Sequence, residues 1–474
     1  MKRPITLSLL VFLLVARSFA AQPFTVEAVE DASAEFPGAP QLHSSAFAQW
    51  NGKLVFIGGR INGYHAVGGG PADFMRAHAN RDVWVVDTTA EPARTYRAAL
   101  TQLPATHLAV KEQWSASAFM STQVGDRLYI AGGYGQNEAG EWLTYPLLSV
   151  VSLPAMIDGV IKGRVPGEAV KFIKSADVQS SGGELLKMPG GDFYLVMGHV
   201  FMGSYSAFES HSENNTPAAS QDYLEEIRQL KIAEVNGALS VSVVKRFKDP
   251  EFHRRDLNIT EVLSEKGVGL AAFGGVFTPK TQSVFTAPVF FRPGETPKID
   301  NDFFQRMNSY SAARLLLYDS KNQSMYVTLF GGISRYYYDF KQGAFCLFPQ
   351  EGTKTTSTYF DGLQWGDQIS TLAIQKDKVK SEWVHEASLP GFLGTNAVFV
   401  PLPEMVLAHE ETRILDLAKL RGSRTLVGYI FGGIRAYPYT FPYNKSATPY
   451  NSGNVPSKAS ELILKVYVTV PEAE

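Results

Sequence analysis

The chain has 474 residues, of which 45% are hydrophobic, 12% aromatic and 19% charged, and its formal net charge at pH 7 is −2. This apolar and aromatic content excludes a disordered chain, because it supplies enough side chains for a large core. The single cysteine excludes a disulfide scaffold and any site built from several cysteines. A chain with neither net positive charge nor a basic run lacks the composition of a nucleic-acid binder.

The first twenty residues have the pattern of a secretory signal. Met1-Lys2-Arg3 is positively charged, residues 5–16 are mainly apolar, and Ser18-Phe19-Ala20 places small residues where a signal peptidase requires them. The apolar run is shorter than the roughly 20 residues of a membrane-spanning helix, and no later run reaches that length. We therefore expect residues 1–20 to be a signal peptide, cleaved after Ala20, and the protein to be exported to the periplasm or the extracellular space without a membrane span.

A short phrase recurs along the rest of the chain: a turn, an apolar strand and then a glycine pair. Its copies end at Gly58-Gly59, Gly132-Gly133, the degenerate Gly198-His199, Gly274-Gly275, Gly331-Gly332 and Gly432-Gly433. Turn signals such as Asn51-Gly52 precede these strands, and such turns join antiparallel hairpins. A strand beside a crowded central axis needs residues without a Cβ, because neighbouring backbones then approach closely.

Four-stranded units repeated around an axis form a β-propeller. Residues 223–232 and 404–420 are the two segments in which the pattern suggests short helices. The sequence therefore predicts an all-β fold, a six-bladed propeller of four-stranded antiparallel blades with long loop insertions, as one domain over residues 21–474. A propeller ring closes when its first and last strands share a blade. We expect residues 24–29 to pair with residues 462–470.

The repeat resembles the kelch family. The resemblance rests on the apolar strand with its glycine pair and on the run RDVWVVD at residues 81–87, and it covers about residues 40–470. It implies a secreted propeller similar to galactose oxidase and kelch-like proteins, with a distant resemblance to the periplasmic kelch-type sialic acid mutarotase. Most units exceed the roughly 50 residues of a kelch repeat, which implies insertions between strands.

In kelch proteins the residue after the glycine pair often faces the opening of the central channel. The resemblance carries this role to Arg60, Tyr134 and His199, and to Arg335 and Arg435 shortly beyond their pairs. Guanidinium groups match carboxylates and hydroxyls, so this set favours an anionic or polyhydroxylated ligand.

The densest polar cluster of the chain adds two candidates to this ligand-binding set. In His253-Arg254-Arg255-Asp256 one arginine is expected to pair with Asp256 while the other faces the ligand. The alternative for all these arginines is a structural ion pair with carboxylates of adjacent blades.

The sequence leaves three functions open. The first is a binding module that recognises a glycan, a sugar acid or a peptide on its channel face. The second is a sugar-processing enzyme such as a mutarotase or epimerase, and the third is a protein-interaction scaffold. We expect a monomer without a cofactor.

A metal site is not expected. The nine histidines show no His-x-x-x-His spacing. A copper radical oxidase would need a cysteine bonded to a tyrosine, whereas Cys346 lies in an apolar strand where we expect a buried, inert thiol.

Overall fold

The computed structural model describes residues 22–65, 74–189, 191–205, 219–348, 362–420, 422, 424–437 and 456–472. The predicted signal peptide lies outside these residues. Strands dominate, and the described α-helices are two short ones, α1 (Leu108–Gln113) and α2 (Leu153–Ile161). No helix in these ranges is long and apolar enough to cross a membrane. The prediction of an all-β fold is therefore confirmed.

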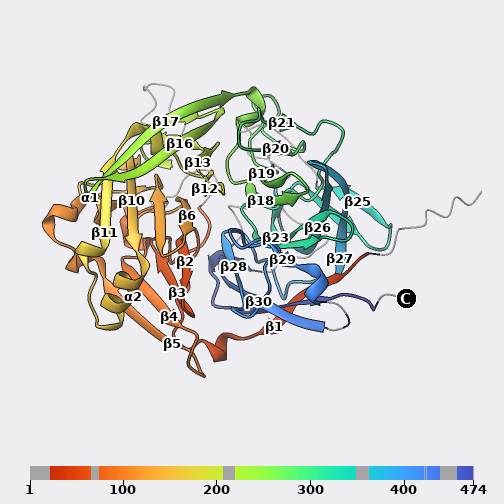
Figure 1. Ribbon diagram of the computed structural model, residues 1–474, viewed down its shortest axis with the longest axis horizontal. Coiled ribbons are helices and arrows are strands. Elements are labelled where there is room, and N and C mark those ends of the chain that lie inside the picture. Colours follow the sequence, from red (N-terminus) through yellow and green to blue (C-terminus); the bar gives the residue numbers. More distant parts are fainter. Residues whose placement is uncertain are drawn as a thin grey trace, which may run out of the picture.

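Six sheets of the described residues radiate around a common centre (Figure 1), as in a β-propeller. Sheet 1 contains β2 (Ala46–Trp50), β3 (Lys53–Ile57), β4 (Asp82–Asp87) and β5 (Arg94–Ala99). Sheet 2 contains β6 (Met120–Val124), β7 (Arg127–Ala131), β10 (Leu147–Ser152) and β11 (Val170–Lys174). Sheet 3 contains β12 (Glu184–Lys187), β13 (Phe193–Val196), β16 (Glu226–Val235) and β17 (Ala238–Lys248).

The second half of the chain forms the other three. Sheet 4 contains β18 (Asn258–Ser264), β19 (Gly267–Phe273), β20 (Val289–Phe291) and β21 (Lys298–Ile299). Sheet 5 contains β22 (Ala313–Asp319), β23 (Ser324–Ser334), β26 (Gln364–Gln375) and β27 (Lys378–Ser388), with β29 (Leu415–Asp416) parallel to β22. Sheet 6 contains β28 (Ala397–Pro401), β30 (Arg424–Gly432), β33 (Leu464–Thr469) and β1 (Thr25–Asp31).

Three small sheets supplement the radial ones. One joins β8 (Tyr134–Gln136), β9 (Trp142–Thr144), β14 (His199–Met202) and β15 (Ser220–Tyr223). The other two are hairpins, β24 (Tyr336–Asp339) with β25 (Ala344–Leu347), and β31 (Ile434–Ala436) with β32 (Ser457–Ala459). Strands β8, β14 and β31 follow directly after a glycine pair or its substitute, so they extend the chain beyond the end of a radial sheet.

The predicted repeat is visible in the strand order. In each radial sheet of the described residues, the strand that leads into a predicted glycine pair is the second one: β3, β7, β13, β19, β23 and β30. One copy needs a correction of register. Met197 (φ 57°) and Gly198 (φ 89°) take the place of the pair, as Gly58 (φ 66°) and Gly59 (φ 84°) do in sheet 1. His199 is therefore the first residue beyond its pair.

Backbones approach closely at the glycine pairs, as expected from the sequence. A Cβ on Gly132 would lie 1.8 Å from the carbonyl oxygen of Ser180, in the segment ahead of sheet 3, and one on Gly59 would lie 2.5 Å from the His43 carbonyl oxygen. Both positions also have positive φ, which residues with a Cβ rarely adopt.

Both predicted helices are wrong. Residues 226–235 form β16, because Asn236-Gly237, with φ of 50° and 81°, turns the chain into a hairpin with β17. Residues 404–420 form a loop, the short β29 and a 3₁₀ turn. In β16, pairing with both neighbouring strands outweighs local helix preference.

The strands at the two ends of the described chain share sheet 6. Strand β1 pairs with β33 in antiparallel register, with Thr25 opposite Thr469 and Asp31 opposite Leu464. The predicted pairing is confirmed. The Val26 amide also donates a hydrogen bond of 3.2 Å to Nδ1 of His385 on β27, so β1 contacts sheet 5 as well.

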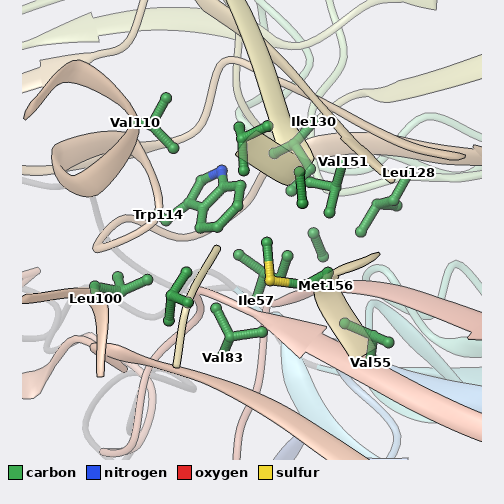
Figure 2. Close-up of a cluster of buried hydrophobic side chains, with 14 of the residues drawn as sticks. Val55, Ile57, Val83, Leu100, Val110, Trp114, Leu128, Ile130, Val151 and Met156 are labelled. Carbon is green, nitrogen blue, oxygen red and sulfur yellow. The ribbon is translucent and has the colours of Figure 1, made fainter. Parts of the chain in front are cut away.

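Apolar side chains fill the spaces between adjacent sheets. Figure 2 shows the cluster between sheets 1 and 2, where Trp114 lies among Ile57, Ile130 and Met156. The Trp114 indole donates a 2.9 Å hydrogen bond to Ser149 Oγ, so its polar atom is also satisfied. Each such fully buried side chain stabilises the fold by about 1.5–3 kcal/mol.

Candidate functional site

Equivalent residue pairs meet at one end of all six radial sheets. Each joins the residue after the glycine pair to a residue just ahead of the first strand. Isolated bridges make four of these pairs: His43 with Arg60, Ser117 with Tyr134, Ser181 with His199, and Arg255 with Val276. In sheet 5 the Tyr310 amide donates to the Ile333 carbonyl (3.0 Å), and in sheet 6 the Ile434 amide donates to the Thr395 carbonyl (2.9 Å).

The next residue in each sheet belongs to what we call the inner ring: Ser44, Ala118, Gly182, Asp256, Ser311 and Asn396. All six have positive φ, between 35° and 70°. Backbone hydrogen bonds link neighbouring members. Each of five amides donates to the carbonyl of the ring residue in a neighbouring sheet: Ala118 to Ser44, Gly182 to Ala118, Asp256 to Gly182, Asn396 to Ser311, and Ser44 to Asn396. Small or polar side chains suit this conformation, because glycine, asparagine and aspartate tolerate it best.

Two cavities border the ring. Residues ahead of the ring and beyond the glycine pairs line a cavity of about 70 Å³, which we call the upper pocket. Residues that follow the ring along the first strands line a cavity of about 720 Å³, which we call the lower chamber. All six ring residues line both cavities.

The upper pocket brings together four of the seven predicted ligand-binding residues: Arg60, Tyr134, His199 and Arg255. They come from sheets 1 to 4 and their extensions. Arg60, Tyr134 and His199 converge because each directly follows a glycine pair or its substitute, whereas Arg255 lies opposite Val276, which holds that place in sheet 4.

Two buried guanidinium groups give the pocket its charge. Arg60 is 4% exposed, lies 4.3 Å from the ring centre of Phe74 and donates through Nε to Asn62 (3.0 Å). Arg255 pairs with Asp256 (2.7 Å), and its Nε donates to the Tyr223 hydroxyl (3.2 Å). Burial alone would lower the pKa of Arg255, but Tyr223 and Asp256 raise it well above its usual value. Both groups can therefore act as fixed cations.

Two imidazoles in the same wall are neutral. Burial, with a smaller effect of Arg60, lowers the pKa of His43 to about 3. Burial, followed by the charge of Arg255, also lowers the pKa of His199 well below its usual value. The Nδ1 atom of His43 lies 3.0 Å from Ser44 Oγ, and its buried Nε2 has no hydrogen-bond partner among the described residues. An atom of this kind can bond a ligand hydroxyl.

Aromatic rings complete the wall. Tyr64 stacks on His65 at 4.2 Å, and His65 lies 4.4 Å from the ring of Tyr205. Phe74 meets Tyr134 edge to face at 5.1 Å, and the Tyr134 hydroxyl donates to the Gly203 carbonyl at 2.7 Å. These contacts hold flat apolar surfaces next to the two cations, an arrangement that suits a ring with both polar and apolar faces.

Arg254 does not line the upper pocket, contrary to the prediction. Its side chain is fully buried, where it pairs with Glu251 (2.9 Å) and donates to the carbonyls of Ala287 (2.9 Å) and Gly274 (3.2 Å). Burial lowers its pKa to about 10. Successive residues of an extended chain face opposite sides, so only its neighbour Arg255 faces the pocket.

Arg335 and Arg435 also lie outside the residues that line the upper pocket. In their sheets the places equivalent to Arg60 are held by Ile333 and Ile434. Arg335 is buried and donates to the carbonyl oxygens of Phe348 and Gly362. Arg435 forms an ion pair with Glu461, which is the structural alternative that the sequence left open.

Sequence reasoning missed the residues that bridge to the predicted ones. His43 and Tyr310 lie directly ahead of ring residues, and these ring residues precede the first strand of a sheet. The same position recurs in each repeat, and this recurrence could have indicated both residues. Phe74 and Tyr205 reach the pocket from insertions and carry no repeat signal.

The thiol of Cys346 is half-buried rather than buried, on β25 opposite Tyr337, so that expectation was wrong. Within the described ranges, no three histidine, cysteine, aspartate or glutamate side chains are grouped so that they could hold a metal ion.

No protein-family model matches the chain, and no curated protein matches it. Among solved structures the chain is similar to that of YjhT, with a TM-score of 0.45 and 12% identity, over 85% of this chain and 93% of that one. The described residues form an all-β fold of mainly four-stranded sheets.

Proposed function

We propose that the protein is an exported, six-bladed kelch-type propeller that binds a small anionic, hydroxyl-bearing ligand, such as a sugar acid, in the upper pocket. The observation that carries the proposal is the convergence of Arg60 and Arg255 with the neutral His43 in one buried pocket. A carboxylate would take up the guanidinium donors, and the imidazole nitrogen would accept from a hydroxyl.

The balance of charge in the pocket supports an anion. Asp256 is the lining carboxylate, and it is already paired with Arg255. Arg60 bonds the neutral amide of Asn62 and faces an aromatic ring. These contacts hold its guanidinium group at the pocket wall, where its positive charge favours an anionic group of a ligand. The aromatic wall suits the apolar face of a sugar ring. The volume of about 70 Å³ has room for only part of a sugar acid, such as its carboxylate end, and not for a long glycan.

The inner ring supports the six-bladed, closed arrangement. Its members occupy one place in each radial sheet, and their backbone hydrogen bonds run from sheet to neighbouring sheet. The β1–β33 pairing gives sheet 6 the strands from both ends of the domain, as propeller closure requires.

Binding is tested by calorimetric titration of the chain without residues 1–20 with glucuronate and N-acetylneuraminate, and with glucose as the neutral comparison. We expect the acids to bind more tightly than glucose. Arg60→Gln and Arg255→Gln should each weaken binding by about 1–3 kcal/mol, the scale of a hydrogen bond to a charged group. Arg435→Gln is the matched control and should bind as the parent does. Equal binding by all three variants would overturn the proposal.

A sugar mutarotase or epimerase is the second candidate, and one observation favours it. Burial raises the pKa of the Asp256 carboxyl despite the opposing effect of Arg255, so this group is suited to accept and return a proton. Asp256→Asn should keep the fold, because asparagine tolerates positive φ. Loss of mutarotation of a bound sugar acid, followed by NMR, with binding retained would identify an enzyme. An unchanged rate would leave a binding protein.

Export is tested at the N-terminus. Secreted or periplasmic material should begin at Ala21, and retention of Met1 would contradict cleavage.

A further inference from the structure

The lower chamber has no role in the function proposed above, yet it has the properties of a binding site. Its volume of about 720 Å³ falls within the range of small-molecule sites. Its wall consists mainly of first-strand residues from all six sheets, joined by loop residues such as Glu410 and Arg413, and the inner ring borders it. Most of the cavity is therefore framed by strands of the fold.

Acidic side chains outnumber basic ones in this wall. The carboxylates are those of Glu184, Asp256, Glu261, Glu410 and Glu411, and the cations are those of Lys187, Arg314 and Arg413. Two carboxylates have full ion pairs, Glu184 with Arg314 (2.8 Å) and Asp256 with Arg255 beyond the ring (2.7 Å). The remaining negative charge is centred on Glu261 and on the exposed Glu410 and Glu411.

Glu261 has a carboxylate oxygen that lacks a hydrogen-bond donor among the described residues. It lies on β18, is 9% exposed, and lines the chamber. One carboxylate oxygen lies 3.9 Å from Arg413, whose own side chain is 58% exposed. The other oxygen is buried without a hydrogen-bond partner among the described residues. A buried carboxylate with one oxygen unbonded is costly, because a lost hydrogen bond to a charged group is not replaced by water.

Aromatic rings lie in the same wall. Phe47, Phe119 and Phe399 line the chamber from sheets 1, 2 and 6. Ring faces attract organic cations, and alkyl chains pack on them. An alkylammonium group would supply both a positive charge and hydrogen-bond donors to Glu261, while its carbon chain would contact the phenylalanines.

We propose that the lower chamber is a second ligand site, separate from the upper pocket, which takes an organic amine with its ammonium group on Glu261. The upper pocket and the lower chamber would thus bind ligands of opposite charge.

Calorimetric titration of the chain lacking residues 1–20 with 1,5-diaminopentane at low ionic strength tests this. The parent should bind the diamine, and Glu261→Gln should weaken binding about tenfold or more. Arg413→Gln should tighten binding several-fold, because it removes the cation that competes for Glu261. Glu386→Gln, at an exposed position of β27 away from both cavities, is the matched control and should bind as the parent does.

Opposite effects of the two chamber variants would establish the site. Absence of binding by the parent, or equal binding by the parent and both variants, would overturn it, and water would then be the partner of Glu261. Should Glu261→Gln fail to fold, the exposed Arg413→Gln variant still decides, since unchanged affinity contradicts the proposal. A parallel titration with glucuronate reports on the upper pocket, so failure of one site is distinguishable from failure of the other.

Discussion

The upper pocket and the lower chamber are built by the same six sheets and share the inner ring, yet they differ in size and charge. The pocket has a volume of about 70 Å³ and is walled by two buried arginines, neutral imidazoles and aromatic rings. The chamber has a volume of about 720 Å³ and is walled mainly by strand residues with an excess of carboxylates.

The difference follows from which part of each repeat faces each cavity. Residues just ahead of the inner ring, beyond the glycine pairs and in the insertions face the pocket, whereas residues of the first strands face the chamber. Each repeat therefore contributes to two surfaces, the pocket and the chamber, which are built on the same strands but carry different side chains. Function can be assigned to each separately.

The largest effect is expected from a deletion that disrupts sheet 6 and thereby both cavities. Deleting residues 459–474 removes β33, which separates β1 from β30 in sheet 6. Both partners then become open edges, and the apolar residues they cover become exposed. We expect loss of cooperative unfolding by circular dichroism. A truncated protein that melts cooperatively at the parent temperature would show that closure does not depend on this sheet.

A glycine substitution tests the close approach of neighbouring backbones at a glycine pair. Gly132→Ala should cost about 3 kcal/mol or more, since its Cβ would lie 1.8 Å from the Ser180 carbonyl oxygen and φ is +63°. Gly125→Ala has similar φ, +56°, but open space, so it should cost only about 1 kcal/mol. Urea midpoints of the two variants give the comparison. Equal losses would mean that close approach at the pair contributes nothing.

Acid should weaken the attachment of β1. Burial lowers the pKa of His385 to about 4, below the 6.5 of the unfolded chain. Its contribution is therefore complete above pH 6.5 and is lost as the pH falls from 6.5 toward 4. The expected loss between pH 7 and 5 is about 2 kcal/mol.

His385→Gln is the variant that isolates this contribution. Glutamine can still accept from the Val26 amide and donate to Thr371, the two partners of the imidazole. Urea unfolding at pH 7 and pH 5 should show a smaller loss in the variant than in the parent. The same loss in both would assign the acid sensitivity to other groups.

The smallest effect concerns the pocket itself. Burial lowers the pKa of His43 to about 3 and holds the pKa of His199 well below its usual value, so neither imidazole adds positive charge to the pocket near neutral pH. Affinity for glucuronate should therefore not rise as the pH falls from 8 to 6.5. Binding that strengthens as the pH falls through 6.5 would show that one of the imidazoles takes up a proton next to the anion.

The repeat made the fold predictable, because a strand plus a glycine pair recurs whatever the loops between copies do. It also indicated Arg60, Tyr134 and His199, which line the upper pocket, whereas Arg255 was indicated by the polar cluster at residues 253–256. It failed for Arg335 and Arg435. Arg335 lies two residues, and Arg435 one residue, beyond the place directly after the glycine pair, and both side chains therefore lie outside the pocket lining. Phe74 and Tyr205 could not be predicted, because their positions depend on contacts between distant insertions rather than on local pattern.

The pairing of β1 with β33 has a consequence for the response of the molecule to force. Thr25 and Thr469 lie opposite each other at one end of the ladder, so tension on the two ends of the domain loads its hydrogen bonds one after another. Strands loaded in this way separate by breaking one hydrogen bond at a time. Strands pulled along their length load all their hydrogen bonds simultaneously and resist more strongly. An early obstacle is the Val26–His385 bond, which ties β1 to the neighbouring sheet. A stretched molecule should therefore open at sheet 6 first, releasing β1 while the other five sheets remain folded.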